Sequence, residues 1–159
     1  MRVLDVGSGG RPLFVGRDEV IHCDVARGEH LEVLCDAHHL PFRDEAFRIV
    51  HASHLLEHCD FPLTVLREFR RVCNGVVVVK VPNAEHREHK RTPDHIYSWN
   101  PLTFEAILKK VFPEVKVYPT IRVARRENLL TTFIIKVALS MLAALFHHNE
   151  LTAICKSKT

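Results

Sequence analysis

The chain has 159 residues, of which 47% are hydrophobic and 26% are charged. This composition excludes a disordered or fibrous chain and predicts one domain over 1–159 with a sizeable core. The net charge of +3 is uneven, because residues 1–60 carry six Arg and no Lys against eleven acidic residues, which leaves the remainder strongly basic. A basic half attracts an anionic substrate, nucleic acid or a lipid surface, unless it is only a solvated face. Five cysteines without a Cys-x-x-Cys pair predict buried thiols in a cytoplasmic protein.

Short apolar runs, rich in Val and Ile and bounded by turn residues, predict a series of strands. They cover residues 3–6, 20–23, 31–35, 47–52 and 75–81, and two more are expected over 115–123 and 151–155. The run at 75–81 is almost continuous valine, which is typical of a strand covered on both faces.

Two amphipathic helices alternate with these strands. The first is expected to begin near Pro62 and to stop at Asn74-Gly75. Its apolar stripe consists of Leu63, Leu66, Phe69 and Cys73. The stripe of the second consists of Phe104, Ile107, Leu108 and Val111. This alternation predicts an α/β fold with a doubly wound, mostly parallel sheet.

Two long segments interrupt the alternation. Residues 82–100 are polar and rich in His, Arg and Lys, which predicts a lid loop on the substrate side, with Tyr97 and Trp99 as aromatic contacts and a positive field that suits an anionic acceptor. Residues 129–146 approach the length of a membrane span, but Lys136 near their middle is costly in lipid. We therefore expect no transmembrane span there, but a helix between the last two strands that packs on the sheet or forms a homodimer or membrane-surface contact.

The string MRVLDVGSGG places a glycine-rich turn directly after the first strand, where α/β folds bind ligands. No Gly-Lys-Ser/Thr follows it, and Pro12 occupies the third glycine position of a dinucleotide fingerprint. Asp5 would repel a pyrophosphate, but it could accept hydrogen bonds from an ammonium group or from ordered water. S-adenosylmethionine carries such an ammonium group and no phosphate, and the Asp-Val-Gly-Ser-Gly string resembles motif I of the class I S-adenosylmethionine-dependent methyltransferases.

Two further acids end or follow predicted strands. Asp24 ends the second strand, nineteen residues after Asp5, and is placed to bind both ribose hydroxyls. Asp36 follows the third strand, where its carboxylate can accept a hydrogen bond from the adenine amino group. Three acids at the ends of successive strands are a more specific pattern than any one of them.

A longer resemblance covers nearly the whole chain. DAHHLPFRDEAFRIVHASHLLEH at 36–58 resembles the small-molecule branch typified by ubiquinone and menaquinone biosynthesis methyltransferases. LREFRRVCNGVVVVKVPN at 66–83 and DHIYSWNPLTFEAILKKVF at 94–112 continue the similarity. The resemblance implies a seven-stranded Rossmann-like sheet with an antiparallel last strand, and S-adenosyl-L-methionine as cofactor. The chain begins at the first strand, so the family's preceding helix is expected to be missing.

The resemblance also implies roles for single residues. Gly7, Ser8 and Gly9 would approach the methionine part of the ligand. Asp24 would hold the ribose, with Val25 against the adenine unless Val25 is a plain core residue.

The adenine pocket is expected to be lined by Asp36, Ala37 and His38, although Ala37 could be core and His38 merely solvated. Ala52 and Ser53, at the end of the fourth strand, would face the donor methionine. The alternative for Ser53 is the N-cap of a following helix.

Methyl transfer from a sulfonium needs a base only if the acceptor must lose a proton. His54 and His58 lie four residues apart and are expected to share one face of a helix, with His54 nearest the methyl group and His58 as helper. Either histidine could instead be structural. The spacing of His86, His89 and His95 matches no tight metal site, so no metal is expected.

The leading interpretation is a methyltransferase acting on a small-molecule acceptor, with nucleic acid less expected. One alternative is a non-catalytic methyltransferase-like module that binds or regulates a partner, and another is a methyltransferase acting on RNA or protein. A nicotinamide-dependent dehydrogenase ranks below these, because the dinucleotide fingerprint is incomplete.

Overall fold

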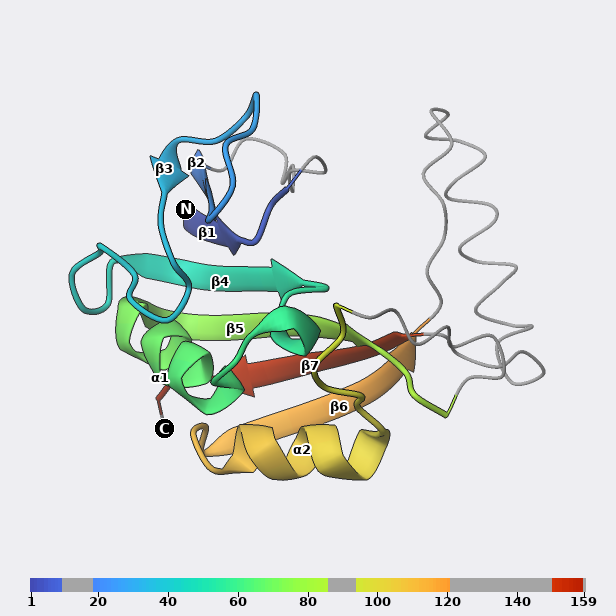
Figure 1. Ribbon diagram of the computed structural model, residues 1–159. Helices are drawn as coiled ribbons and strands as arrows, with labels where there is room; N and C mark the ends of the chain where they lie inside the picture. Colours follow the sequence, from blue (N-terminus) through green and yellow to red (C-terminus); the bar gives the residue numbers. More distant parts are fainter. Residues whose placement is uncertain (10–18, 86–93, 121–149, 159) are drawn as a thin grey trace, which may run out of the picture.

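A computed structural model describes residues 1–9, 19–85, 94–120 and 150–158 (Figure 1). Its elements in chain order are β1 (Arg2–Val6), β2 (Glu19–Asp24), β3 (Val33–Leu34), β4 (Phe47–Ser53), the 3₁₀ turn η1 (Leu56–His58), α1 (Pro62–Val72), β5 (Cys73–Pro82), α2 (Pro101–Lys109), β6 (Glu114–Thr120) and β7 (Glu150–Lys156). The strands form one seven-stranded sheet in the order β3-β2-β1-β4-β5-β7-β6.

The direction of the strands confirms the predicted fold. β1 pairs in parallel with β2 and β4, and the parallel pairing continues from β2 to β3 and from β4 to β5. β7 is antiparallel to both of its neighbours, β5 and β6. The strand order reverses at β1, so the carboxyl ends of β1 to β4 open onto a shared crevice.

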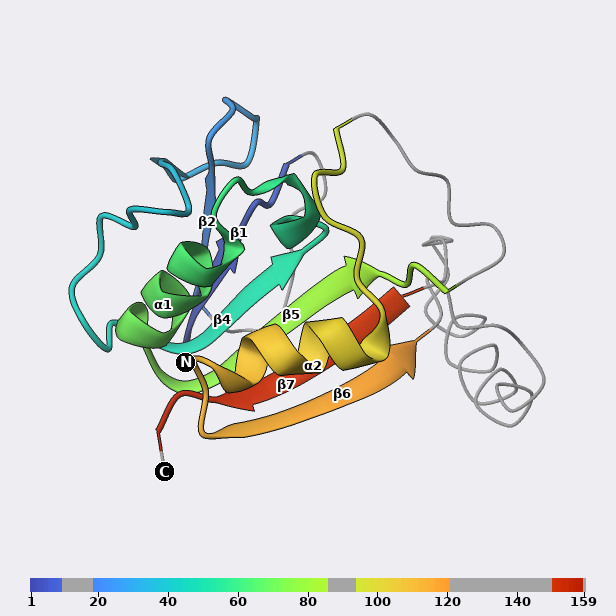
Figure 2. The same cartoon turned by 60° about the horizontal axis from the view of Figure 1, so that its bottom comes forward.

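The helices α1 and α2 pack on the same face of the sheet, α1 against β4 and β5 and α2 against β6 and β7 (Figure 2). The buried face of α1 is formed by Pro62, Val65, Leu66, Phe69 and Val72. The predicted stripe was therefore partly wrong, because Leu63 lies at its margin and Cys73 already belongs to β5.

The expected helix stop at Asn74-Gly75 is also wrong. α1 ends at Val72, and the chain enters β5 at Cys73 without an intervening turn. The register between β4 and β5 shifts here, because Phe47 pairs with Cys73 and Ile49 with Val76, so Asn74 and Gly75 together oppose a single residue of β4. A Cβ on Gly75 would lie only 2.4 Å from the carbonyl oxygen of Arg48, so this glycine serves close strand approach in a bulge.

Substituting Gly75 by alanine is therefore expected to destabilise the fold by about 1–3 kcal/mol, because the β4 backbone must move to make room. Chemical denaturation followed by circular dichroism measures the effect. Gly28→Ala is the matched control, since the nearest atom to its added Cβ lies 3.7 Å away. Equal stability of the two variants would contradict this account of the bulge.

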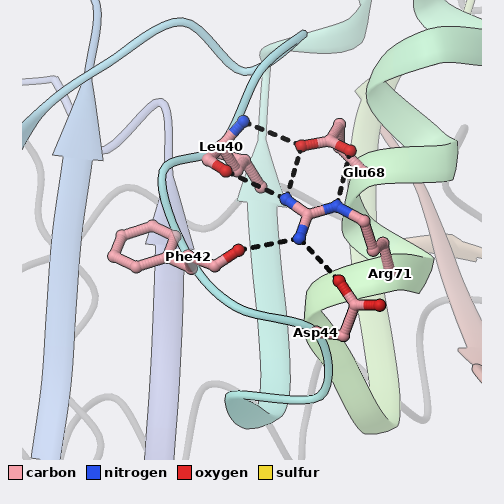
Figure 3. A network of polar contacts seen from close by, with 5 residues as sticks. All are labelled: Leu40, Phe42, Asp44, Glu68 and Arg71. Atoms are coloured by element: carbon pink, nitrogen blue, oxygen red, sulfur yellow. Dashed lines mark hydrogen bonds and ion pairs between the residues drawn. The ribbon is translucent and has the colours of Figure 1, made fainter.

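The third strand is shorter than predicted, and side-chain contacts hold the chain that follows it. The guanidinium of Arg71 on α1 donates to both carboxylate oxygens of Glu68 at 2.7 and 2.8 Å and to Asp44 at 2.9 Å (Figure 3). It also donates to the carbonyl oxygens of Phe42 at 2.7 Å and Leu40 at 2.9 Å. The amide of Leu40 in turn donates to Glu68 at 2.9 Å, so this network fastens the segment after β3 onto α1.

Removal of the Arg71 side chain is expected to cost about 2–3 kcal/mol of unfolding free energy, because two backbone carbonyls and two carboxylates lose a donor. Arg71 holds the pKa of Glu68 below its ordinary value near 4.5, so the wild type should lose this contribution as the pH falls below about 4.5. The free energy of unfolding, measured between pH 3 and 7, should therefore decrease less at the acidic end in Arg71→Ala than in the wild type. Arg67→Ala, an exposed arginine of the same helix, is the control.

Several predicted features lie outside the described residues. These are the apolar segment 129–146, the central part of the lid at 86–93 with Arg87, Lys90 and Arg91, and the part of the strand 115–123 beyond Thr120. In the described ranges, no helix combines the length and apolar character needed to cross a membrane.

Candidate cofactor and acceptor site

A cavity of about 630 Å³ lies at the carboxyl ends of β1 and β2, bounded by the segment after β3 and the segment between β4 and α1. A cavity of this volume is in the usual range for small-molecule and cofactor sites. Its lining consists of Val6, Gly7, Asp24, Val25, Cys35, Asp36, Ala37, His38, His39, Leu55, His58, Cys59, Asp60, Phe61 and Thr64.

The structure brings many of the sequence-predicted site residues to this cavity and leaves others outside it. Those in the lining are Gly7, Asp24, Val25, Asp36, Ala37, His38 and His58. Those outside the lining are Asp5, Ser8, Gly9, Ala52, Ser53 and His54. Ala52 is only 1% exposed and is a core residue of β4.

The glycine turn folds back over the end of β2. Gly7 and Gly9 both have positive φ, +70° and +50°, a conformation that favours glycine. The amides of Gly7 and Ser8 donate to the carbonyl oxygen of Cys23 at 2.8 and 3.3 Å. A Cβ on Gly7 would also meet the Leu55 side chain at 3.0 Å, so position 7 leaves little room for a larger residue.

Asp24 connects the turn to the cavity. One carboxylate oxygen accepts from the amide of Gly9 and the other from the amide of Ala26, both at 2.9 Å. These two backbone hydrogen bonds fix the orientation of the carboxylate at the end of β2, which faces the cavity. A preoriented carboxylate of this kind suits the predicted grip on two ribose hydroxyls.

Asp5 lies on β1 with only 3% of its surface exposed. Its carboxylate oxygen is 2.7 Å from Nδ1 of His51, which stands opposite it in register on β4. The acid before the glycine turn is thus joined to the neighbouring strand, and the sequence did not identify His51 as its partner.

Asp36 and His38 form one wall of the cavity. The carboxylate of Asp36 accepts a hydrogen bond from the backbone amide of His38 at 2.9 Å and lies 2.7 Å from ring Nδ1 of the same residue. The hydrogen bond from the backbone amide is the main cause that lowers the pKa of Asp36. His38 Nε2 accepts from the amide of Phe61 at 3.3 Å, which joins the segment after β3 to the start of α1. His38 is therefore held by neighbours on both sides.

Exposed apolar side chains accompany these acids. Phe61 is 68% exposed and Val25 is 75% exposed, and both line the cavity. Large exposed apolar residues at the mouth of a cavity are suited to a flat aromatic ligand. Sequence reasoning missed Phe61, although its position directly before the first proline of a helix was a usable signal.

The expectation that His54 and His58 share a helix face is wrong. His54, directly after the last residue of β4, has a φ of +56°, and only a 3₁₀ turn at Leu56–His58 follows. Ser53 caps no helix, because it is the last residue of β4 and the turn begins at Leu55 without a side-chain cap. The two imidazoles consequently face different surroundings.

His54 lies between two buried carboxylates. Its Nε2 is 2.7 Å from Glu150 on β7 and its Nδ1 is 3.2 Å from Glu57 on η1. The hydrogen bond with Glu150, followed by the longer contact with Glu57, raises the pKa of His54 to about 9. At neutral pH this histidine is an imidazolium, which holds a proton rather than accepting one.

His58 faces the cavity instead. Its Nδ1 lies 3.0 Å from the carbonyl oxygen of Asp94. Because a carbonyl only accepts, Nδ1 is the donor and the neutral ring carries its lone pair on Nε2. Of the two predicted histidines, His58 lines the cavity and His54 does not.

Of the two aromatic residues that were expected to contact the acceptor from the lid, one packs in the core. Trp99 is buried and lies between Tyr97, whose ring stacks on it at 5.5 Å, and Phe104 of α2. A bridge between Asn83 and Trp99 closes the base of the 82–100 segment. Trp99 therefore belongs to the core, whereas the hydroxyl of Tyr97 donates to the carbonyl oxygen of Asp60 at the cavity edge.

Comparison with known proteins relates this part of the chain to a protein family model. Residues 4–79 match the family model described as a methyltransferase domain. Among curated proteins, none matches the chain significantly.

Solved structures share the fold at low sequence identity. A methyltransferase from Haloferax volcanii in complex with the Trm112 methyltransferase activator is 14% identical, with 99% of this chain and 83% of that chain covered and a TM-score of 0.67. A SAM-dependent methyltransferase from Archaeoglobus fulgidus is 21% identical, with 98% and 85% covered and a TM-score of 0.62. The [4+2]-cyclase SpnF is 20% identical, with 98% and 73% covered and a TM-score of 0.61.

These neighbours are alike in fold alone, and they show that the fold also hosts a reaction other than methyl transfer. The family match covers the glycine turn, Asp24, Asp36 and the 36–58 segment, which are the parts that build the cavity. The part of the chain that builds the cavity therefore matches a methyltransferase domain, and the chain as a whole shares the fold of S-adenosylmethionine-dependent methyltransferases.

Proposed function

We propose that the protein transfers the methyl group of S-adenosyl-L-methionine to a small-molecule acceptor by in-line displacement. The observation that carries this proposal is the cavity itself, in which two oriented carboxylates, Asp24 and Asp36, stand beside the apolar side chains of Val25 and Phe61. Such a donor set fits a nucleoside, because carboxylates accept from ribose hydroxyls and from an adenine amino group while apolar side chains cover the base.

We assign the cofactor contacts to residues at these positions. Asp24 holds the ribose, and Asp36, Ala37 and His38 surround the adenine. Gly7 borders the cavity at the methionine side, and Ser8 and Gly9 act through the shape of the turn. Asp5, Ala52 and Ser53 lie outside the cavity lining, at the strands that carry it.

The chemistry of the step is largely positioning. The bound cofactor supplies an electrophilic methyl group on a charged sulfur. The chain's own residues orient the acceptor and exclude water, and an acceptor that must lose a proton can pass it to Nε2 of His58. His54 does not serve as this base, because Glu150 and Glu57 retain its proton at neutral pH.

A small acceptor is favoured because the cavity volume of about 630 Å³ lies in the usual range for small-molecule sites. A reducing cytoplasm is the expected compartment, since Cys23, Cys59, Cys73 and Cys155 are buried thiols.

A second candidate function is the binding of a regulatory protein partner, because the Haloferax volcanii neighbour forms a complex with a methyltransferase activator.

Methyl-labelled cofactor tests this proposal. The protein is incubated with separated small-molecule, RNA and protein fractions of a cell extract, and His58→Ala and Asp24→Ala are run in parallel. We expect label in the small-molecule fraction, lower turnover in both variants and normal cofactor binding in His58→Ala. Label in RNA or protein would contradict the small-molecule acceptor and identify the acceptor class instead. Cofactor binding without any labelled product would favour the non-catalytic module.

A further inference from the structure

Three potential metal ligands meet at the edge of the cavity. Glu57 and His58 lie on η1, and His95 comes from the segment that leads into α2, which passes beside η1 (Figure 2). One ligand atom from each lies within 4.8 Å of the other two. The rings of His58 and His95 are 4.8 Å apart and nearly perpendicular, so the two imidazoles converge.

The backbone holds these ligands in place. The amides of Ile96 and Tyr97 donate to the carbonyl oxygen of Glu57 at 2.8 and 3.2 Å, which fixes the segment of His95 against η1. Nδ1 of His58 donates to the carbonyl oxygen of Asp94, which leaves Nε2 with the lone pair. Metal-binding histidines commonly donate their second nitrogen to a backbone carbonyl in this way.

The carboxylate of Glu57 gives an independent indication. The residue is 1% exposed, and within the described part of the chain neither carboxylate oxygen accepts a well-oriented hydrogen bond. The imidazolium of His54 approaches Oε1 at 3.2 Å but makes its shorter contact with Glu150 at 2.7 Å. Glu57 thus shares the His54 ring with a second carboxylate, and the lone pairs of its two oxygens that this one contact leaves over are available to coordinate a metal.

We propose that Glu57, His58 and His95 form a binding site for a first-row divalent cation, of which Zn²⁺ is the best match. Two imidazoles and one carboxylate are a common ligand set for such metals, and Zn²⁺ sites with three protein ligands keep a position open. Tetrahedral ligands at about 2.0 Å from zinc stand roughly 3.3 Å apart, so side-chain rotation must close part of the present separation.

The site deepens the proposed function and rests on it in one respect. Because His58 lines the cavity, the open position would hold an oxygen or nitrogen of the acceptor. The substrate class is then an acceptor with a ligating group, such as a phenolate or carboxylate, and the metal lowers the pKa of that group. His58 would contact the acceptor through the metal and would not act as a free base.

Metal titration of the full-length protein tests the site without any acceptor. After treatment with EDTA and its removal, Zn²⁺ binding is measured by calorimetry and Co²⁺ binding by its visible absorption. We expect one tight site whose affinity falls at least about 10-fold in His95→Ala and in His58→Ala. His39→Ala is the control, because this exposed histidine also lines the cavity but lies outside the cluster.

The outcomes separate the metal site from the proposed function. Absence of a tight site, or affinity unchanged in both variants, would overturn the site, while cofactor binding and methyl transfer could still be observed. A tight site combined with turnover that survives EDTA undiminished would overturn the acceptor-holding role. Loss of turnover with EDTA and its return with Zn²⁺ would support both, with circular dichroism showing that each variant is folded.

Discussion

Asp24→Ala is expected to weaken the binding of S-adenosyl-L-methionine by about 100-fold, because a charged acceptor of two ribose hydrogen bonds is removed. The substitution also frees the amides of Gly9 and Ala26, which the carboxylate now holds at 2.9 Å. The glycine turn should therefore lose its orientation together with the ribose contact. Calorimetric titration with the cofactor and with its demethylated product measures both affinities.

Two further variants separate these effects. Asp24→Asn retains an oxygen that can accept from one of the two amides, so its affinity should fall between those of the wild type and the alanine variant. Glu29→Ala removes an exposed acid from the loop that follows β2 and should bind the cofactor as the wild type does. An Asp24→Ala protein with wild-type affinity would remove Asp24 from the ribose site, whatever the reaction.

The strands were predictable because each is a short run of apolar residues between turn residues. β5 was the clearest, since a strand at the centre of a sheet is buried on both faces and its valines need no alternation. Asp24 and Asp36 could be placed for a related reason. The carboxyl ends of parallel strands meet at one edge of the sheet, so acids at successive strand ends converge.

The errors arose where local pattern was overruled by distant contacts. The spacing of His54 and His58 suggested a helix, but the positive φ of His54 turns the chain out of that register. The partner that holds this conformation is Glu150, 96 residues away on the antiparallel strand. Nothing in the spacing of two histidines carries information about that strand.

The Glu57, His58 and His95 cluster was missed for a similar reason. The sequence directed attention to the spacing within 86–95, whereas the ligands of the cluster come from two separate segments. They meet because the amides of Ile96 and Tyr97 bind the carbonyl oxygen of Glu57, a backbone contact between positions nearly forty residues apart. Gly75 shows the same limitation, since its function depends on a carbonyl of β4.

His54→Ala is expected to lower the free energy of unfolding by about 3–5 kcal/mol. The imidazolium lies between Glu150 and Glu57, whose side chains are only 9% and 1% exposed, and its removal leaves two buried carboxylates without their shared cation. The contact also joins the end of β4 to the start of β7, so its loss should loosen the edge of the sheet next to the cavity. Urea denaturation at neutral pH measures the change.

Charge removal on the partner strand provides the critical control. In the double variant His54→Ala, Glu150→Gln one of the two buried charges is gone, so much of the lost stability should return. His39→Ala, which removes an exposed histidine near the same cavity, should leave stability within about 0.5 kcal/mol of the wild type. If His54→Ala is as stable as His39→Ala, the imidazolium does not hold the two carboxylates. His54 would then return to consideration as the residue that accepts a proton from the acceptor.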